Sequence, residues 1–244
     1  MKNQPVDICI VTYNRLEYLK NCVWSIIAST KINYRLIVIS DNSTDGTNEW
    51  LNEMKSHGKI DEIIINEENL GSTKTFNKVI NASTSEFFVM LNDDMWFHRG
   101  WDEACVRLFN ENKDCGIVTF FNYPIDHRIE KRRHNKYSYK WPETGLAASM
   151  IRKRLFNSTR GFRLPEGVKM GYFARVFCKE VAGLKDLQNK QYITDPYYAE
   201  QMDRFNPGVP GRPKLHQEYL YGEYNKRRGI EKTKHKDILA GKRK

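Results

Sequence analysis

Two adjacent carboxylates follow an apolar run in the first half of this 244-residue sequence. Asp93 and Asp94 come directly after Asn92 and the run at residues 87–91, which is apolar at every position. Such a run is typical of a strand buried on both faces. Side chains that follow the strand emerge at its carboxyl end, where oxygen ligands can hold Mg²⁺ or Mn²⁺ against a diphosphate. An Asp pair is also common in turns and helix caps, so both interpretations stand at this point.

A second polar cluster, Thr12, Tyr13 and Asn14, follows the β-branched run at residues 8–11. These side chains suit stacking on a nucleobase and hydrogen bonding to it. Tyr13 equally fits an aromatic residue that packs against the core.

A third cluster, residues 41–47, follows the apolar run at residues 36–39. Asp41 is placed to accept hydrogen bonds from a base or ribose, and Asp45 to cap the helix that follows. Ordinary turn chemistry explains the same composition equally well.

The apolar runs alternate with segments of helical periodicity, which predicts an α/β fold with a mostly parallel sheet flanked by helices. Ligands bind such sheets beyond the carboxyl ends of the strands, where the three clusters lie. The expected strands are 8–11, 36–39, 63–65, 87–91 and 117–120, and the expected helices are 16–27, one that follows the cluster at 41–47 and runs through 50–54, and 71–80.

The composition fits one compact body with basic character. Hydrophobic residues make up 40%, and 40 Lys and Arg against 30 Asp and Glu give a formal charge of +10. This excess favours polyanionic partners, whether diphosphates, nucleic acid or an anionic membrane.

Cysteine usage and hydropathy favour the cytoplasm. The five cysteines form no CxxC pair, and Cys9, Cys22 and Cys105 lie in apolar segments where a thiol behaves as a small hydrophobe. The start of the sequence is too polar for a signal peptide, and no run approaches the roughly 20 apolar residues of a membrane span. We therefore expect any membrane contact to be peripheral, at the inner face.

Four polar segments together resemble the family 2 glycosyltransferases of the GT-A fold. They are residues 10–14 (Ile-Val-Thr-Tyr-Asn), 41–47 (Asp-Asn-Ser-Thr-Asp-Gly-Thr), 69–71 (Asn-Leu-Gly) with Asn77, and 92–94 (Asn-Asp-Asp). The resemblance covers about the first 120 residues. It implies a donor that is a nucleotide-diphosphate sugar, with a uridine nucleotide expected, and Mn²⁺ or Mg²⁺ as the metal.

The resemblance also implies roles for the residues at the first, second and fourth segments. Thr12 and Tyr13, with the adjacent Asn14, would hold the nucleoside together with Asp41. Asp94 would be the principal metal carboxylate. Asp93 would bind the ribose or the same metal.

The third segment would face the phosphates. Asn69 and Gly71 open a helix whose N-terminal amides suit an anion, and Lys74 lies in its first turn. Lys74 also fits a solvated helix charge. Many relatives carry Arg just before the residue that matches Asn77, whereas this chain has Phe76.

The catalytic base is expected in the second half. Residues 161–168 resemble the family's Gly-Gly-Phe and Glu-Asp region, in which Glu166 matches the Glu, while Gly167 replaces the Asp that serves inverting relatives as base. Either Glu166 or another carboxylate such as Asp195 would take that role. His216 precedes a stretch that resembles the segment where GT-A enzymes often place a metal-binding His.

Three parts of one compact domain follow from these assignments. Residues 1–120 would bind the nucleotide sugar, residues 121–215 would bind the acceptor and catalyse transfer, and residues 216–244 form a basic segment. The basic, aromatic stretch 127–141 would face the acceptor. The predicted activity is metal-dependent transfer of a sugar, with inversion, to a hydroxyl of a glycan or lipid-linked acceptor.

Three alternatives stay open. A nucleotidyltransferase would need a Gly-rich phosphate loop after the first strand, where this chain has residues 12–15 (Thr-Tyr-Asn-Arg). The altered base motif also fits a non-catalytic nucleotide-sugar-binding protein. The basic character leaves DNA with hydroxymethylated bases as a possible acceptor. The oligomeric state is open.

Overall fold

The computed structural model describes residues 5–121, 146–164, 173–184, 189–194 and 198–202. Helices and strands alternate through the first four strands, as expected. In chain order the elements are β1 (Val6–Thr12), α1 (Leu16–Ser29), β2 (Tyr34–Ser40), α2 (Thr47–Ser56), β3 (Glu62–Ile65), α3 (Ser72–Ala82), β4 (Phe87–Asn92), β5 (Met95–Phe97), α4 (Trp101–Glu111), β6 (Cys115–Thr119), β7 (Ser149–Arg152), α5 (Lys153–Asn157), α6 (Phe173–Gly183), β8 (Lys190–Ile193) and β9 (Ala199–Gln201).

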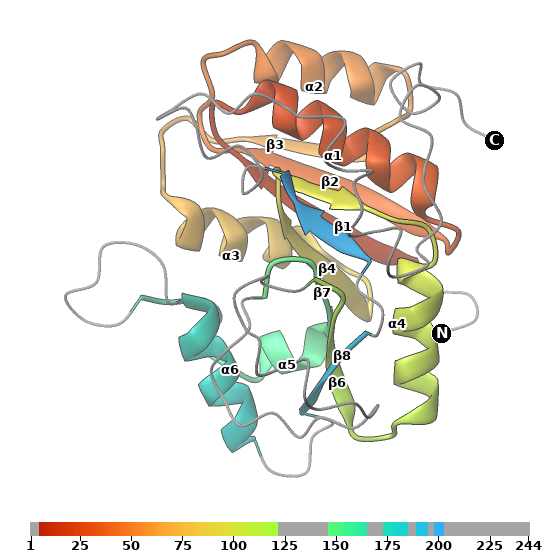
Figure 1. Ribbon diagram of the computed structural model, residues 1–244. Helices are drawn as coiled ribbons and strands as arrows, with labels where there is room; N and C mark the ends of the chain where they lie inside the picture. The colour runs from red at the N-terminus through yellow and green to blue at the C-terminus, as the bar shows by residue number, and fades with distance from the viewer. Residues whose placement is uncertain (1–4, 122–145, 165–172, 185–188, 195–197, 203–244) are drawn as a thin grey trace.

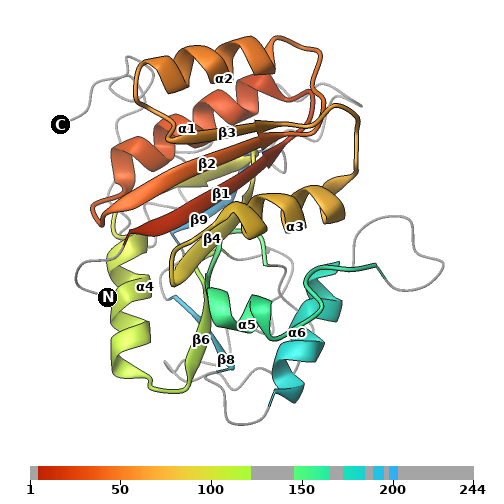
Figure 2. The same cartoon turned by 180° about the vertical axis from the view of Figure 1, so that it is seen from behind.

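One mostly parallel sheet organises the described residues. Its seven strands lie in the order β3-β2-β1-β4-β7-β6-β8, and β7 alone among them runs against its neighbours. Figures 1 and 2 show α1 and α2 on one side of β1, β2 and β3 and α3 on the other. The predicted α/β class is therefore confirmed. The strand expected at 117–120 instead begins at Cys115 and ends at Thr119.

Alternation along the strands divides the core into two. Ile8 and Ile10 face a cluster that includes side chains of α1, α2 and α4, whereas Cys9 and Val11 face a cluster with α3, α5 and α6. Successive side chains of a strand point to opposite faces, so a strand covered on both sides needs apolar residues at every position. This requirement produces the continuous apolar runs of the sequence.

All five cysteines are buried as thiols and form no disulfide in the part of the chain that the structure describes. Burial raises the pKa of the Cys115 thiol to about 12 and also raises that of Cys9 and Cys105. These thiols pack as small hydrophobes, as the sequence predicts. No helix among the described residues is long and apolar enough to cross a membrane.

An ion pair between Asp7 and Arg35 joins β1 and β2 near their amino ends. Asp7 is fully buried and accepts hydrogen bonds from Arg35 Nε at 3.1 Å and Nη2 at 3.0 Å. The N–H groups of Thr84 and Ser85 donate to the same carboxylate at 2.9 and 3.2 Å. Burial opposes ionisation, but the hydrogen bonds from Arg35 and the serines outweigh it and lower the pKa of Asp7.

We predict that Asp7→Asn lowers the free energy of unfolding by about 2 kcal/mol at pH 7, because Arg35 loses its buried partner. Folding lowers the pKa of Asp7. The contribution of ionised Asp7 to the free energy of unfolding is therefore complete above its unfolded-state pKa of about 3.9, and it is lost as pH falls through its folded-state pKa. Urea denaturation of both proteins at pH 7 and below pH 4 measures this difference, which should shrink at the lower pH.

The matched control is Glu86→Gln, which removes an ion pair with Arg152 in which the Glu86 side chain is 59% exposed. Its cost should stay below about 1 kcal/mol. An equal cost for both substitutions would contradict the structural role of Asp7.

Candidate active site

The polar loops after β1, β2 and β4 meet at the carboxyl edge of the sheet. The N–H of Asp41 donates to the carbonyl oxygen of Thr12 at 2.9 Å. The Thr12 hydroxyl donates to Oδ2 of Asp93 at 2.7 Å. Parallel neighbours end at the same edge, so three segments distant in sequence are joined here by short hydrogen bonds.

Asp93 and Asp94 form a buried acidic pair in the turn between β4 and β5. Only 3% of Asp93 and 1% of Asp94 are exposed. Arg15 Nη1 lies 3.3 Å from a carboxylate oxygen of each residue. Gln201 Nε2 donates to Asp94 Oδ2 at 2.9 Å from β9, which pairs with β5. The pair is therefore fixed by both halves of the chain.

Sequence reasoning missed Arg15 and Gln201. Arg15 is the first cation after the Thr-Tyr-Asn cluster, and this adjacency is the signal that identifies it. Gln201 is 107 residues from Asp94 and offers no signal in a single sequence. Cys22 lies near the pair, and burial together with the charges of Asp93 and Asp94 raises its pKa well above the ordinary value, so its thiol stays neutral.

Asp41 holds the loop that leads into α3. Its Oδ1 accepts hydrogen bonds from Asn66 Nδ2 at 2.8 Å and Leu70 N at 2.9 Å, and its Oδ2 accepts one from Gly71 N at 3.0 Å. Lys78 extends this network by donating to Asn66 Oδ1 at 2.7 Å. Gly71 has φ 78° and ψ 153°, a conformation that strongly favours glycine. Both carboxylate oxygens thus support the backbone in this structure.

Asn14 and Asp45 tie the first two loops together. Asn14 Oδ1 accepts a hydrogen bond from Thr44 N at 2.7 Å. Asp45 accepts one from Leu16 N at 3.0 Å and one from Thr47 N at 3.2 Å, so it caps the starts of both α1 and α2. Burial would raise the pKa of Asp45, but the hydrogen bonds from Thr47 and Leu16 outweigh it and lower the pKa.

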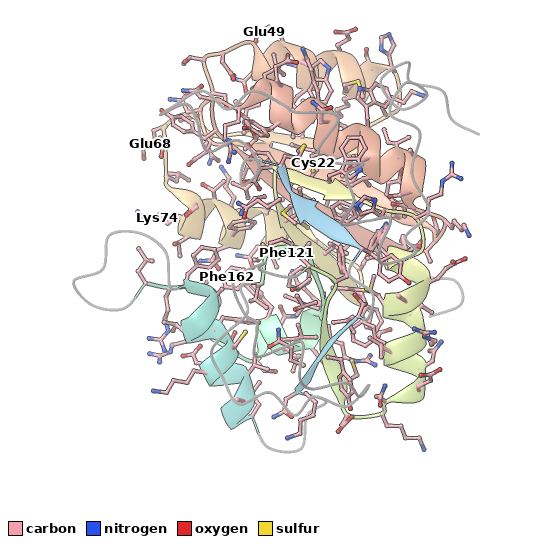
Figure 3. All side chains as sticks on the ribbon, viewed as in Figure 1. Cys22, Glu49, Glu68, Lys74, Phe121 and Phe162 are labelled. Atoms are coloured by element: carbon pink, nitrogen blue, oxygen red, sulfur yellow. The ribbon has the colours of Figure 1, made fainter. Side chains whose placement is uncertain are left out.

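Three of the predicted donor-binding residues lie at or near the surface. Tyr13 is 46% exposed, so it is a surface aromatic rather than a core residue. Lys74 is exposed on α3, on the same flank as Glu68 in Figure 3. Asn69 Oδ1 accepts a hydrogen bond from Gly71 N at 3.0 Å and so shapes the turn before α3.

Asn77 connects α3 to the second half of the chain. Its Nδ2 donates to the carbonyl oxygen of Phe162 at 2.6 Å, and its Oδ1 accepts the Phe162 N–H at 2.8 Å. A Cβ atom on Gly161 would lie 2.8 Å from Asn77 Oδ1, and Gly161 has φ 68°. Glycine is therefore needed for this approach. The carboxamide of Asn77 is engaged on both sides.

Phe76, where the family resemblance leads us to expect Arg, is a core residue. It is 1% exposed and packs against the rings of Phe162 and Phe173, with centroids 6.3 and 5.6 Å apart. Phe162 lies between α3 and α6 in Figure 3. Phe76 thus joins α3 to α6 through apolar contact with Phe173.

The predicted residues Glu166, Asp195 and His216 lie outside the described residues, as does the stretch 127–141. Within the described ranges, no three or more His, Cys, Asp or Glu side chains gather as a metal site would require. Mg²⁺ is commonly held by one or two carboxylates together with substrate phosphates. Asp93 and Asp94 fit that donor set.

Comparison with known proteins identifies the family. Residues 7–177 match the family model described as glycosyl transferase family 2. The chain belongs to this family. The match extends from β1 into α6, so it includes the acidic pair and the segment that Asn77 holds.

A curated relative and two solved structures are similar to this chain. An uncharacterized glycosyltransferase of Haemophilus influenzae is 30% identical over 134 residues, which cover 48% of this chain and 42% of that relative. The chain thus spans less than half the length of that curated relative. The mannosyltransferase PcManGT of Pyrobaculum calidifontis, solved with GDP-Man and Mn²⁺, superposes with a TM-score of 0.64 at 17% identity, covering 98% of this chain and 68% of that chain.

S. aureus TarS, solved with UDP-GlcNAc, has a TM-score of 0.59 at 16% identity, covering 80% of this chain and 57% of that chain. Because the two solved structures are only 17% and 16% identical to this chain, the similarity shows a shared fold, which is the GT-A fold. They confirm the fold that the four sequence segments predict.

We predict that Asn77→Ala lowers the free energy of unfolding by about 2 kcal/mol, because two backbone groups of Phe162 lose their partners. Asn81→Ala, an exposed position on the same helix, is the control and should change stability by less than about 0.5 kcal/mol. Urea denaturation measures both. Equal stability of the two variants would show that the hydrogen bonds to Phe162 do not hold the segment.

Proposed function

We propose that this chain transfers a sugar from a nucleotide-diphosphate sugar to a hydroxyl group, with the donor bound at the carboxyl edge of β1, β2 and β4. The observation that carries the proposal is the buried pair Asp93 and Asp94, which the end of β1, the loop after it and β9 hold in one place. Asp pairs in ordinary turns stay in water, whereas this pair is buried and held by an Arg, a Thr and a Gln from distant segments. The family membership of the chain supports the same reaction.

The nucleoside would bind beside Tyr13, whose exposed ring offers a surface for stacking on a base. Thr12 and Asp41 would support this site through their contacts with Asp93 and with the loop before α3. UDP is the expected nucleotide, and the UDP-GlcNAc complex of TarS supports it. GDP in the PcManGT complex makes guanosine nucleotides the first alternative to compare.

A divalent metal would bind at Asp94, with Asp93 on the same metal or on the ribose. When bound, Mn²⁺ or Mg²⁺ neutralises the negative charge that grows on the departing diphosphate. The first amides of α3, from Ser72 to Lys74, would face the phosphates on the other side, because those of Leu70 and Gly71 already donate to Asp41. His216 is the further proposed metal ligand. The PcManGT complex with Mn²⁺ supports metal dependence by analogy of fold.

A carboxylate would deprotonate the acceptor hydroxyl, which attacks the anomeric carbon and inverts its configuration. Glu166 and Asp195 are the proposed bases. Asn77 fixes the backbone at Phe162, four residues before Glu166. The hydrogen bond from Thr194 N to Thr119 O, 3.0 Å long, fixes the residue before Asp195.

The proposed acceptor is a glycan or a lipid-linked glycan. Residues 122–244 contain 28 Lys and Arg against 13 Asp and Glu, whereas residues 1–121 contain 12 against 17. The acceptor half is therefore the basic half, which favours an acceptor that carries phosphate or carboxylate groups. Peripheral contact with an anionic membrane is consistent with that charge.

We predict that UDP with Mn²⁺ raises the melting temperature by about 5 °C or more at saturating ligand, because both bind only the folded state. Asp94→Asn should lose the part of this shift that depends on Mn²⁺. Glu49→Gln, an exposed acid on α2, removes the same charge away from the site and should respond like the wild type. Thermal denaturation with UDP, GDP and their sugars measures the shifts.

The proposed function would be wrong if no nucleotide diphosphate raised the melting temperature, with or without Mn²⁺. Slow hydrolysis of the preferred donor in the presence of Mn²⁺ would separate a transferase from a non-catalytic binding protein. Binding to DNA that weakens steeply with salt would instead favour a nucleic-acid acceptor.

A further inference from the structure

Arg15 provides a positive charge between the two carboxylates of the proposed metal site. Its Nη1 atom lies 3.3 Å from Asp93 Oδ1 and 3.3 Å from Asp94 Oδ2. The side chains of Asp93 and Asp94 are 4% and 2% exposed, whereas that of Arg15 is 32% exposed. One guanidinium nitrogen therefore bridges a nearly buried acidic pair from the solvent side.

A bridging cation at this place has a physical reason. Two adjacent carboxylates that leave water without a counter-charge destabilise the folded chain. The Thr12 hydroxyl and the Gln201 amide also donate to the pair, but both groups are neutral. Arg15 supplies the charge that these two donors cannot.

The same position creates a competition. A divalent ion bound to either oxygen of the Asp94 carboxylate, at about 2.1 Å, would lie beside the guanidinium, because Arg15 contacts Oδ2 of the same group. Two cations on one carboxylate pair repel each other. The metal must therefore move the guanidinium away or bind weakly beside it.

Arg15 has room to move. It lies at the start of α1, where its side chain makes no capping hydrogen bond. Its guanidinium carbon lies 4.5 Å from the centre of the Tyr18 ring, a contact that stabilises a cation without a carboxylate. With a third of the side chain exposed, it can leave Asp94 and stay solvated.

We propose that Arg15 is an exchangeable counter-cation: it offsets part of the negative charge of Asp93 and Asp94 before a metal binds and is displaced from Asp94 by the divalent metal. The inference rests on the proposed function. If Arg15 competes in this way, the metal alone binds weakly. The phosphates of the nucleotide add negative charge, which offsets the repulsion between the metal and Arg15. Metal and nucleotide binding are then coupled, each strengthening the other by the same factor.

The experiment measures Mn²⁺ binding from the electron paramagnetic resonance signal of the free ion, with and without UDP. Wild type, Arg15→Gln and Lys20→Gln are compared. Lys20 lies on the same helix in a surface ion pair with Glu17, so its substitution removes the same charge but leaves the acidic pair intact.

Arg15→Gln should bind Mn²⁺ alone about tenfold more tightly than wild type, and the enhancement by UDP should fall by a similar factor. Lys20→Gln should match wild type in both respects. If UDP enhances Mn²⁺ binding in all three proteins but Arg15→Gln binds the metal alone no more tightly, the counter-cation role is wrong and the metal site stands. If no protein binds Mn²⁺ even with UDP, the metal site fails, and the role of Arg15 fails with it.

If Arg15→Gln fails to fold, the proposal can be tested on the wild-type protein by NMR. The Nε–H resonance of Arg15, assigned by its absence from the spectrum of Arg15→Lys, should shift when Mg²⁺ and UDP are added together. Mg²⁺ is diamagnetic, so the shift reports the new environment of the guanidinium. A resonance that stays unchanged at saturating Mg²⁺ and UDP would overturn the proposal.

Discussion

The burial of Asp93 and Asp94 at the end of β4 is the constraint on which the rest of the site depends. Two neighbouring charges with 3% and 1% exposure are stable only if other groups compensate them. Arg15 provides opposite charge, and Thr12 and Gln201 provide hydrogen bonds. Because these groups come from the first loop and from β9, satisfying the pair also fixes how the two halves of the chain meet.

Loops that surround this pair are held by their own polar contacts. Asp41 gives both carboxylate oxygens to Asn66 and to the backbone before α3, so the helix that would face the phosphates starts at a fixed point. Asn77 then connects that helix to Phe162 in the second half. A ligand at the sheet edge would therefore meet a site that is largely organised before binding, which lowers the entropic cost of binding.

The sequence predicts the fold well because the signals are local. Continuous apolar runs require strands covered on both faces. In the helix predicted at 16–27, Leu19, Val23 and Ile26 are fully buried and Ile27 is partly buried. Long-range polar contacts escape such reasoning: neither Gln201 with Asp94 nor Asn77 with Phe162 leaves a periodic trace. Phe76, in contrast, can be interpreted from the sequence alone. Its apolar side chain cannot bind phosphate, and in the structure it packs against Phe162 and Phe173.

A crystal structure of the protein with UDP and Mn²⁺ tests the central claim most directly, because anomalous scattering locates manganese independently of any model. We expect manganese about 2.1 Å from a carboxylate oxygen of Asp94, with the diphosphate on its other side. We also expect that Arg15 no longer contacts Asp94. Manganese bound elsewhere, with Arg15 and Gln201 still on Asp94, would contradict the assignment of this edge as the donor and metal site.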